Sequence, residues 1–139
     1  MITYLANSTG ETDMPLYRVF TRSDEFDQST KLSVAKSITD THCGLTGAPK
    51  EFVHVFYIES DQVEKGSVEV LGAIRSGRSE EVENGIIRKI QDALLQSADI
   101  PRDKIKVGLM GVQAKWVMEA GAIMPEPGEE ADWFAQHHR

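Results

Sequence analysis

The sequence predicts an α/β (α+β) fold in which two β-α-β units form a four-stranded sheet with two helices on one face. Four short segments either alternate apolar and polar residues or are rich in β-branched and aromatic residues, as strands are. Two longer segments repeat apolar residues at steps of three and four, as helices do. The order strand, helix, strand occurs twice, so the two halves form a structural repeat.

The first unit begins at Pro15, and residues 15–21 alternate as a strand does. Capping residues at 24–29 precede a helix that is expected from Thr30 to about Cys43 and that Gly47 helps to end. A second strand is expected at 52–59 because these residues are β-branched and aromatic. The apolar face of the helix is expected to consist of Leu32, Ala35, Ile38, His42 and Leu45.

The second unit starts with a strand expected at 67–75 and continues through a tight turn to Ser79, which can cap the next helix. A fourth strand is expected at 104–110, followed by a short helix at 113–120. The buried face of the long helix is expected to consist of Val82, Ile86, Ile90, Leu94 and Ala98.

The composition is that of a soluble domain, with 139 residues, 27% charged residues and a net charge of -7. The negative charge argues against a nucleic-acid partner, and no apolar run is long enough for a membrane span. A single cysteine, Cys43, and the lack of a visible signal peptide favour a cytoplasmic location. We expect no metal site, because no residues show metal-ligand spacing, and no cofactor.

Arg75 and Arg78 are candidates for binding an anion, because they lie where a strand is followed by a helix. Two guanidinium groups beside the N-terminal amides of a helix can hold a carboxylate. The alternative is that both arginines are solvated and pair with Glu80 or Glu81.

Three other residues carry candidate chemistry, each with a structural alternative. His42 lies on the apolar face of the first helix, where it can be a buried structural residue or a functional one. Glu119 stands among apolar residues that can raise its pKa and make it a base, or it faces solvent. Pro15 is either an ordinary first residue of a strand or, as a free N-terminus, a secondary amine that can transfer protons.

From Pro15 to about Phe134 the chain resembles the cis-3-chloroacrylic acid dehalogenase family of the tautomerase superfamily. The resemblance implies the fold of the tautomerases and of macrophage migration inhibitory factor, assembled as a homotrimer. The matching segments are Pro15-Leu-Tyr, Val34 to Gly47, Arg75-Ser-Gly-Arg-Ser79, Met118-Glu-Ala-Gly121, and Pro125-Glu-Pro-Gly128 with Trp133-Phe134.

The resemblance also implies a role for each candidate residue. Pro15 and Glu119 would be catalytic, and His42, Arg75 and Arg78 would bind a small carboxylate substrate. The implied enzyme is an isomerase that catalyses keto–enol tautomerisation on unsaturated or 2-oxo acids. Hydration or weak hydrolytic dehalogenation of 3-haloacrylates is implied as a related activity.

Residues 1–14 and Gly108 depart from the family pattern. Residues 1–14 are polar, and we expect a disordered extension or a mis-assigned start before a domain at 15–139. If they are retained, the nitrogen of Pro15 is an amide without basicity, and the protein is a catalytically inactive trimeric module. Gly108 stands where the family has an active-site tyrosine, which reduces the expectation of efficient dehalogenation.

Overall fold

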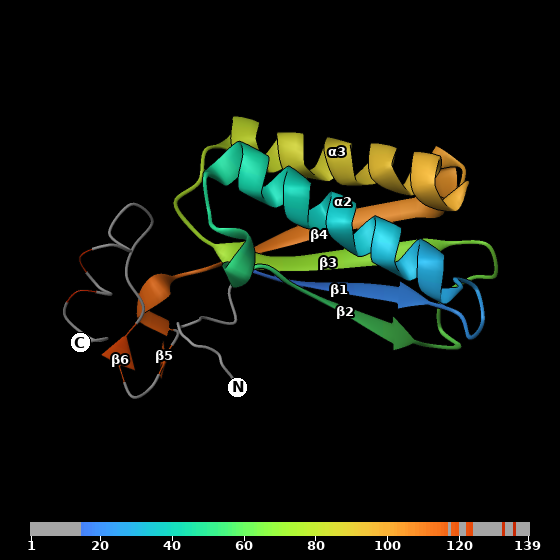
Figure 1. The fold of residues 1–139 in the computed structure, drawn as a ribbon, viewed down its shortest axis with the longest axis horizontal. Coiled ribbons are helices and arrows are strands. Elements are labelled where there is room, and N and C mark those ends of the chain that lie inside the picture. Colours follow the sequence, from blue (N-terminus) through green and yellow to red (C-terminus); the bar gives the residue numbers. More distant parts are fainter. Residues whose placement is uncertain (1–14, 117, 120–121, 124–131, 133–134, 136–139) are drawn as a thin grey trace.

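The computed structural model describes residues 15–116, 118–119, 122–123, 132 and 135. Figure 1 shows a sheet with both long helices on one of its faces, as the sequence predicted. The sheet has the strand order β2-β1-β3-β4, and its strands are β1 (Leu16–Thr21), β2 (His54–Glu59), β3 (Val68–Arg75) and β4 (Ile105–Val112).

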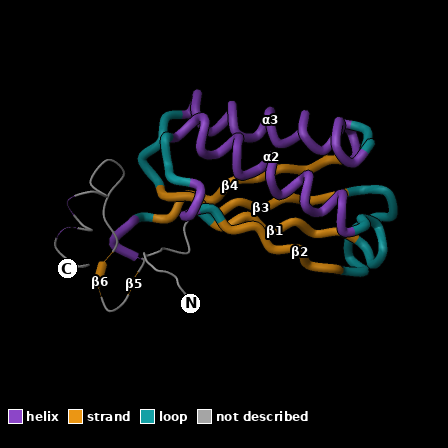
Figure 2. Tube along the Cα trace, in the orientation of Figure 1, coloured by secondary structure: helices purple, strands orange, loops and turns teal. Residues whose placement is uncertain are grey.

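The pairing of the strands confirms the two β-α-β units. β1 and β2 are parallel, β3 and β4 are parallel, and the two units meet where β1 and β3 pair antiparallel. Consequently β1 and β2 start at the same end of the sheet at which β3 and β4 finish. We call this end the proline end, because Pro15 lies immediately before β1. Figure 2 shows the helices and strands as two layers, with loops at both ends of the strands.

Helix α2 (Gln28–Thr46) is longer at both ends than the sequence pattern indicated. Asp27 caps its N-terminus by accepting a hydrogen bond of 2.8 Å from the backbone N–H of Thr30. The helix ends at Gly47, whose φ of 78° is left-handed and therefore favours glycine.

The buried face of α2 consists of Val34, Ile38 and His42. The expectation that Leu32 belongs to it is wrong, because Leu32 is 66% exposed. A helix turns about 100° per residue, so Leu32 lies about 200° from Val34 around the helix axis. Apolar residues spaced by three and four are compatible with a face that contains Leu32 and with a face that contains Val34. Packing against the sheet decides that the face with Val34 is buried.

Helix α3 (Glu80–Ala98) agrees closely with its prediction. The hydroxyl of Ser79 accepts a hydrogen bond of 3.1 Å from the backbone N–H of Val82, which confirms the predicted cap. The predicted face is also confirmed, with Ile86, Ile90 and Leu94 fully buried and Val82 and Ala98 packed against the edge of the core.

The core lies between the helices and the sheet, and Tyr17 is its largest fully buried side chain. Tyr17 pairs in register with Gly72 on β3. A Cβ atom on Gly72 would lie 2.5 Å from Cε1 of Tyr17 and 2.9 Å from Cδ2 of Leu109, so the glycine leaves the space that the ring occupies. The position of the Tyr17 ring is therefore set by close packing on β3.

The short helix expected at 113–120 is wrong. Only Ala114–Trp116 form a 3₁₀ turn, and the next described residues are a strand, β5 (Met118–Glu119), paired antiparallel with β6 (Ala122–Ile123). Trp116 and Met118 are both more than half exposed. A short helix is stabilised mainly by burying its apolar side chains against the rest of the protein. Trp116 and Met118 are not buried in this way, so a helix here would lack that stabilisation.

Candidate active site

The proline end of the sheet brings together four of the five residues that the sequence singled out. Pro15 is buried, and its carbonyl accepts a hydrogen bond of 3.1 Å from the N–H of His54 on β2. Arg75 is the last residue of β3, and Arg78 lies in the turn between β3 and α3. His42 lies near the C-terminal end of α2, and the positive charges of both arginines act on its ring.

His42 is the buried centre of this group, with only 1% of its surface exposed. Its Nδ1 lies 2.7 Å from the hydroxyl oxygen of Tyr17, and the two rings meet edge to face. Its Nε2 is also buried, and it has no hydrogen-bond partner among the described residues. A buried polar atom without a partner costs about 1–3 kcal/mol, so Nε2 is a candidate contact for a ligand.

The site keeps His42 and Tyr17 uncharged at neutral pH. Burial, followed by the positive charges of Arg78 and Arg75, lowers the pKa of His42 to about 4. Burial raises the pKa of Tyr17 well above its ordinary value, although the charge of Arg78 acts in the opposite direction. The positive charge of the site therefore comes from the two guanidinium groups rather than from the histidine.

The turn between β3 and α3, which carries Arg78, is held to β4 at its start. The N–H of Ser76 donates a hydrogen bond of 2.9 Å to the carbonyl of Val112 on β4. Gly77 has a φ of 99°, which other residues rarely adopt. Arg75 is 4% exposed, and Arg78 is half-buried beside the N-terminus of α3. Two guanidinium groups next to a helix N-terminus favour an anionic ligand, and a carboxylate fits their geometry.

Glu119 follows the proline end of the sheet along the chain, and Gly108 lies within β4. Glu119 is in β5, outside the four-stranded sheet, and its side chain is outside the described part of the chain. Gly108 is in β4 and pairs with Leu71, on the sheet face that the helices do not cover. The family-like segments at 125–128 and 133–134 lie outside the described residues.

Tyr17 is a site residue that reasoning from the sequence missed. The sequence pattern indicated only that it is one of the alternating residues of the first strand. A signal was present, because Tyr17 follows Pro15 by two residues and therefore lies on the same face of β1. What could not be read from the sequence is that α2 places His42 above this position.

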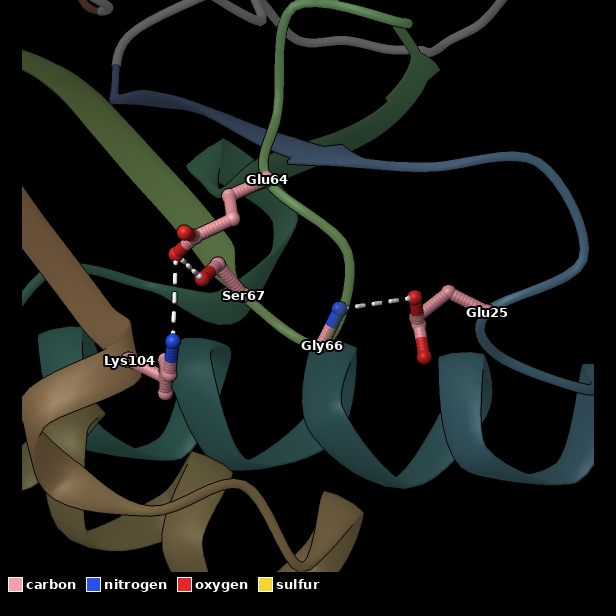
Figure 3. Close-up of polar contacts among 5 residues, drawn as sticks. All are labelled: Glu25, Glu64, Gly66, Ser67 and Lys104. Atoms are coloured by element: carbon pink, nitrogen blue, oxygen red, sulfur yellow. Dashed lines mark hydrogen bonds and ion pairs between the residues drawn. The ribbon is translucent and has the colours of Figure 1, made fainter.

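The opposite end of the sheet carries a cleft of about 350 Å³ between the segments 62–69 and 103–106. Figure 3 shows its polar contacts: Lys104 and Ser67 each donate to one oxygen of Glu64 at 3.2 Å. The hydrogen bond from Lys104 lowers the pKa of Glu64. Both Lys104 and Glu64 are exposed, so this is an ordinary surface ion pair, and we assign no function to the cleft.

The described residues hold neither a candidate metal cluster nor a helix fit to cross a membrane. They contain no group of three His, Cys, Asp or Glu side chains that could hold a metal ion. Of their helices, none is both long and apolar enough to cross a membrane.

The two β-α-β units in one sheet form the fold of the tautomerases and of macrophage migration inhibitory factor. A family model described as "Putative oxalocrotonate tautomerase enzyme" matches residues 14–138, and the chain belongs to this family. Among curated proteins, none matches the chain significantly.

Solved structures agree with this assignment. The crystal structure of N1, a member of the cis-3-chloroacrylic acid dehalogenase family, is 27% identical with a TM-score of 0.80, covering 87% of this chain and 91% of N1. The native protein Ps01740 is 28% identical with a TM-score of 0.71, over 76% of this chain and all of that one (100%). Macrophage migration inhibitory factor of Toxoplasma gondii shares the fold at 14% identity, with a TM-score of 0.69, over 79% of this chain and 100% of that one.

Proposed function

We propose that this protein is an enzyme that moves a proton on small unsaturated or 2-oxo carboxylic acids, in a keto–enol tautomerisation. The observation that carries the proposal is the buried Nε2 of His42, which has no hydrogen-bond partner among the described residues and feels the charges of Arg75 and Arg78. These groups supply what a carboxylate needs, namely positive charge and hydrogen-bond donors away from water. The family match supports an enzyme over the non-catalytic module.

In the proposed mechanism, Arg75, Arg78 and His42 bind the carboxylate of the substrate, and Pro15 transfers the proton. This mechanism requires a chain whose first residue is Pro15, so that its nitrogen is an amine. An α-amine has a reference pKa of about 7.7–8.0, and burial close to two guanidinium groups lowers it further. The neutral amine takes a proton from the carbon next to the carbonyl group and returns it to the oxygen or to another carbon.

Hydration and dehalogenation are proposed as slower activities of the same site. For a 3-haloacrylate, Pro15 in its protonated form would donate a proton to C2 while Glu119 takes a proton from the water that adds to C3. The halide then leaves from C3, whose hydroxyl loses its proton and becomes a carbonyl. We expect this reaction to be slow, because Gly108 provides no phenol to position the water or the substrate.

Replacing Arg78 by alanine tests the carboxylate site. In a chain that begins at Pro15, Arg78→Ala should lower kcat/KM for a 2-oxo acid about 10- to 100-fold, since it removes hydrogen bonds to a charged group. Arg88→Ala, on the exposed side of α3, is the matched control and should have little effect. The methyl ester of the same acid should be a poor substrate for the wild type and should be almost insensitive to Arg78→Ala. Equal losses for acid and ester would contradict a carboxylate contact.

We also propose that the protein is a homotrimer in which the uncovered face of the sheet is buried. Phe56, Leu71 and Met110 on this face are 55%, 39% and 56% exposed. Arg18 lies between Phe56 and Leu71 in the strand register, and its buried Nε has no hydrogen-bond partner among the described residues. An acceptor from a second copy would satisfy it. A structural neighbour, the fused 4-OT, is described as a symmetric trimer, at 19% identity and a TM-score of 0.70, over 79% of this chain and 95% of that one.

Sedimentation equilibrium can test the assembly. The wild type is expected to sediment at three times the mass of the 15.5 kDa chain. Leu71→Asp should dissociate the trimer, because it places a charge on the buried face. Leu95→Asp is the matched control, since Leu95 is 37% exposed but lies on α3, and it should remain trimeric. A monomeric wild type would contradict the proposal.

A further inference from the structure

The contact between Tyr17 and His42 joins three elements of the fold. Tyr17 comes from β1, His42 from α2, and the ring of Tyr17 lies in the space left by Gly72 on β3. The hydroxyl oxygen of Tyr17 is 2.7 Å from Nδ1 of His42, and the ring centroids are 5.7 Å apart. Both side chains are fully buried, so water does not compete for this hydrogen bond.

The possible proton positions can be compared by counting the groups they leave unsatisfied. Within the described part of the chain, the Tyr17 hydroxyl has Nδ1 as its hydrogen-bond partner, and Nε2 has none. If Tyr17 donates to Nδ1, only the Nε2–H group lacks a partner. If Nδ1–H donates to Tyr17 instead, both the phenol O–H and the Nε2 lone pair lack one. A protonated imidazole leaves the phenol O–H and Nε2–H unpaired and places a third cation beside Arg75 and Arg78.

We propose that Tyr17 is a positioning residue that donates its hydroxyl proton to Nδ1 of His42 and so holds the imidazole in the neutral tautomer with hydrogen on Nε2. The free Nε2–H group then points a donor at a bound ligand. The inference rests on the proposed function only where it names a carboxylate as the acceptor.

This tautomer decides what His42 can do. Its only nitrogen lone pair in the ring plane, on Nδ1, is occupied by Tyr17, so His42 is not a general base. With Nε2–H and two guanidinium groups, His42, Arg75 and Arg78 offer donors to a ligand and no acceptor. They therefore select an acceptor-only group such as an ionised carboxylate and disfavour the protonated acid or an alcohol. Tyr17 thereby affects substrate selection without touching the substrate.

Nitrogen NMR of histidine-labelled protein reads the tautomer directly. In the wild type at neutral pH, His42 is expected to show hydrogen on Nε2 and an unprotonated, hydrogen-bonded Nδ1. Tyr17→Phe keeps the ring and removes the donor, so the Nδ1 resonance should shift and the hydrogen should redistribute between the two nitrogens. A wild-type His42 with its hydrogen on Nδ1 would overturn the proposal whether or not the variant folds.

Tyr57→Phe is the matched control. Tyr57 also lies on the helix-covered face of the sheet, and its hydroxyl donates a hydrogen bond of 2.8 Å to the carbonyl of Lys31 on the same helix α2. Both variants lose one hydrogen bond between a tyrosine and α2, but only Tyr17→Phe should move the His42 resonances. Equal His42 spectra in the two variants would overturn the proposal.

Steady-state kinetics of a chain that begins at Pro15 provide a second test of the role of Tyr17. Tyr17→Phe should raise KM for a 2-oxo acid about 3- to 10-fold and change kcat less, because the tautomer affects binding of the carboxylate. Tyr57→Phe should leave both constants near their wild-type values. If the chain has no activity while the NMR result holds, the proposed function fails and the assignment of Tyr17 stands.

Discussion

A chain that begins at Pro15 is expected to catalyse keto–enol proton transfer, whereas the chain that retains residues 1–14 is expected to be about 10²- to 10⁴-fold less active. The reason is the bond that precedes Pro15. A free Pro15 is a secondary amine that can bind and release a proton, while an amide nitrogen cannot. Because Pro15 lies at the same end of the sheet as His42, Arg75 and Arg78, its amine would lie close to a bound carboxylate.

The experiment compares two purified chains, one starting at Met1 and one at Pro15, with their first residues verified by intact mass. Ultraviolet absorbance follows the enolisation of a 2-oxo acid, and halide release follows the turnover of 3-chloroacrylate. Pro15→Ala in the shorter chain provides the control for the amine, because alanine supplies a primary amine without the ring. Full activity of this variant, or equal activity of the two chains, would rule out Pro15 as the proton carrier.

The largest loss of stability is expected from Ile38→Ala in α2, which should lower the free energy of unfolding by about 2–5 kcal/mol. Ile38 is completely buried (0% exposed) between the helix and the sheet, so its removal leaves a cavity as well as losing apolar burial. Urea denaturation followed by circular dichroism, at one fixed protein concentration, gives the difference between variant and wild type.

Leu32→Ala is the matched control in the same helix. Leu32 is 66% exposed, so this substitution should change the free energy of unfolding by less than about 0.5 kcal/mol. The pair also tests which face of α2 is buried, a point on which the sequence pattern was misleading. A loss for Leu32→Ala as large as that for Ile38→Ala would show that both faces are covered.

The sequence predicted the elements whose signals are local. The caps at Ser79 and Gly47 follow from the preferences of single residues, and the face of α3 follows from a regular spacing of large apolar residues. Prediction failed where a local pattern had two solutions. Steps of three and four allowed Leu32 in the core of α2, and a short helix was expected at 113–120, where β5 is a strand.

The sequence likewise predicted some properties of the candidate site and not others. The sequence identified His42, Arg75 and Arg78 by their residue types and by their resemblance to a family, and the structure placed them at one end of the sheet. The charge state of His42 could not be predicted, because its pKa depends on burial and on charges from β3 and the turn before α3. Tyr17 was missed for the same reason, since its partner lies 25 residues away in the chain.

By itself, the sequence determined the order of strands and helices, the ends of the helices and the residues that can carry chemistry, because these depend on near neighbours in the chain. Only the tertiary structure decided that Tyr17 lies against His42 and that Nε2 is buried without a partner among the described residues. Burial and hydrogen bonding are properties of groups brought together from distant segments. They exist only once β1, β3 and α2 are packed against one another.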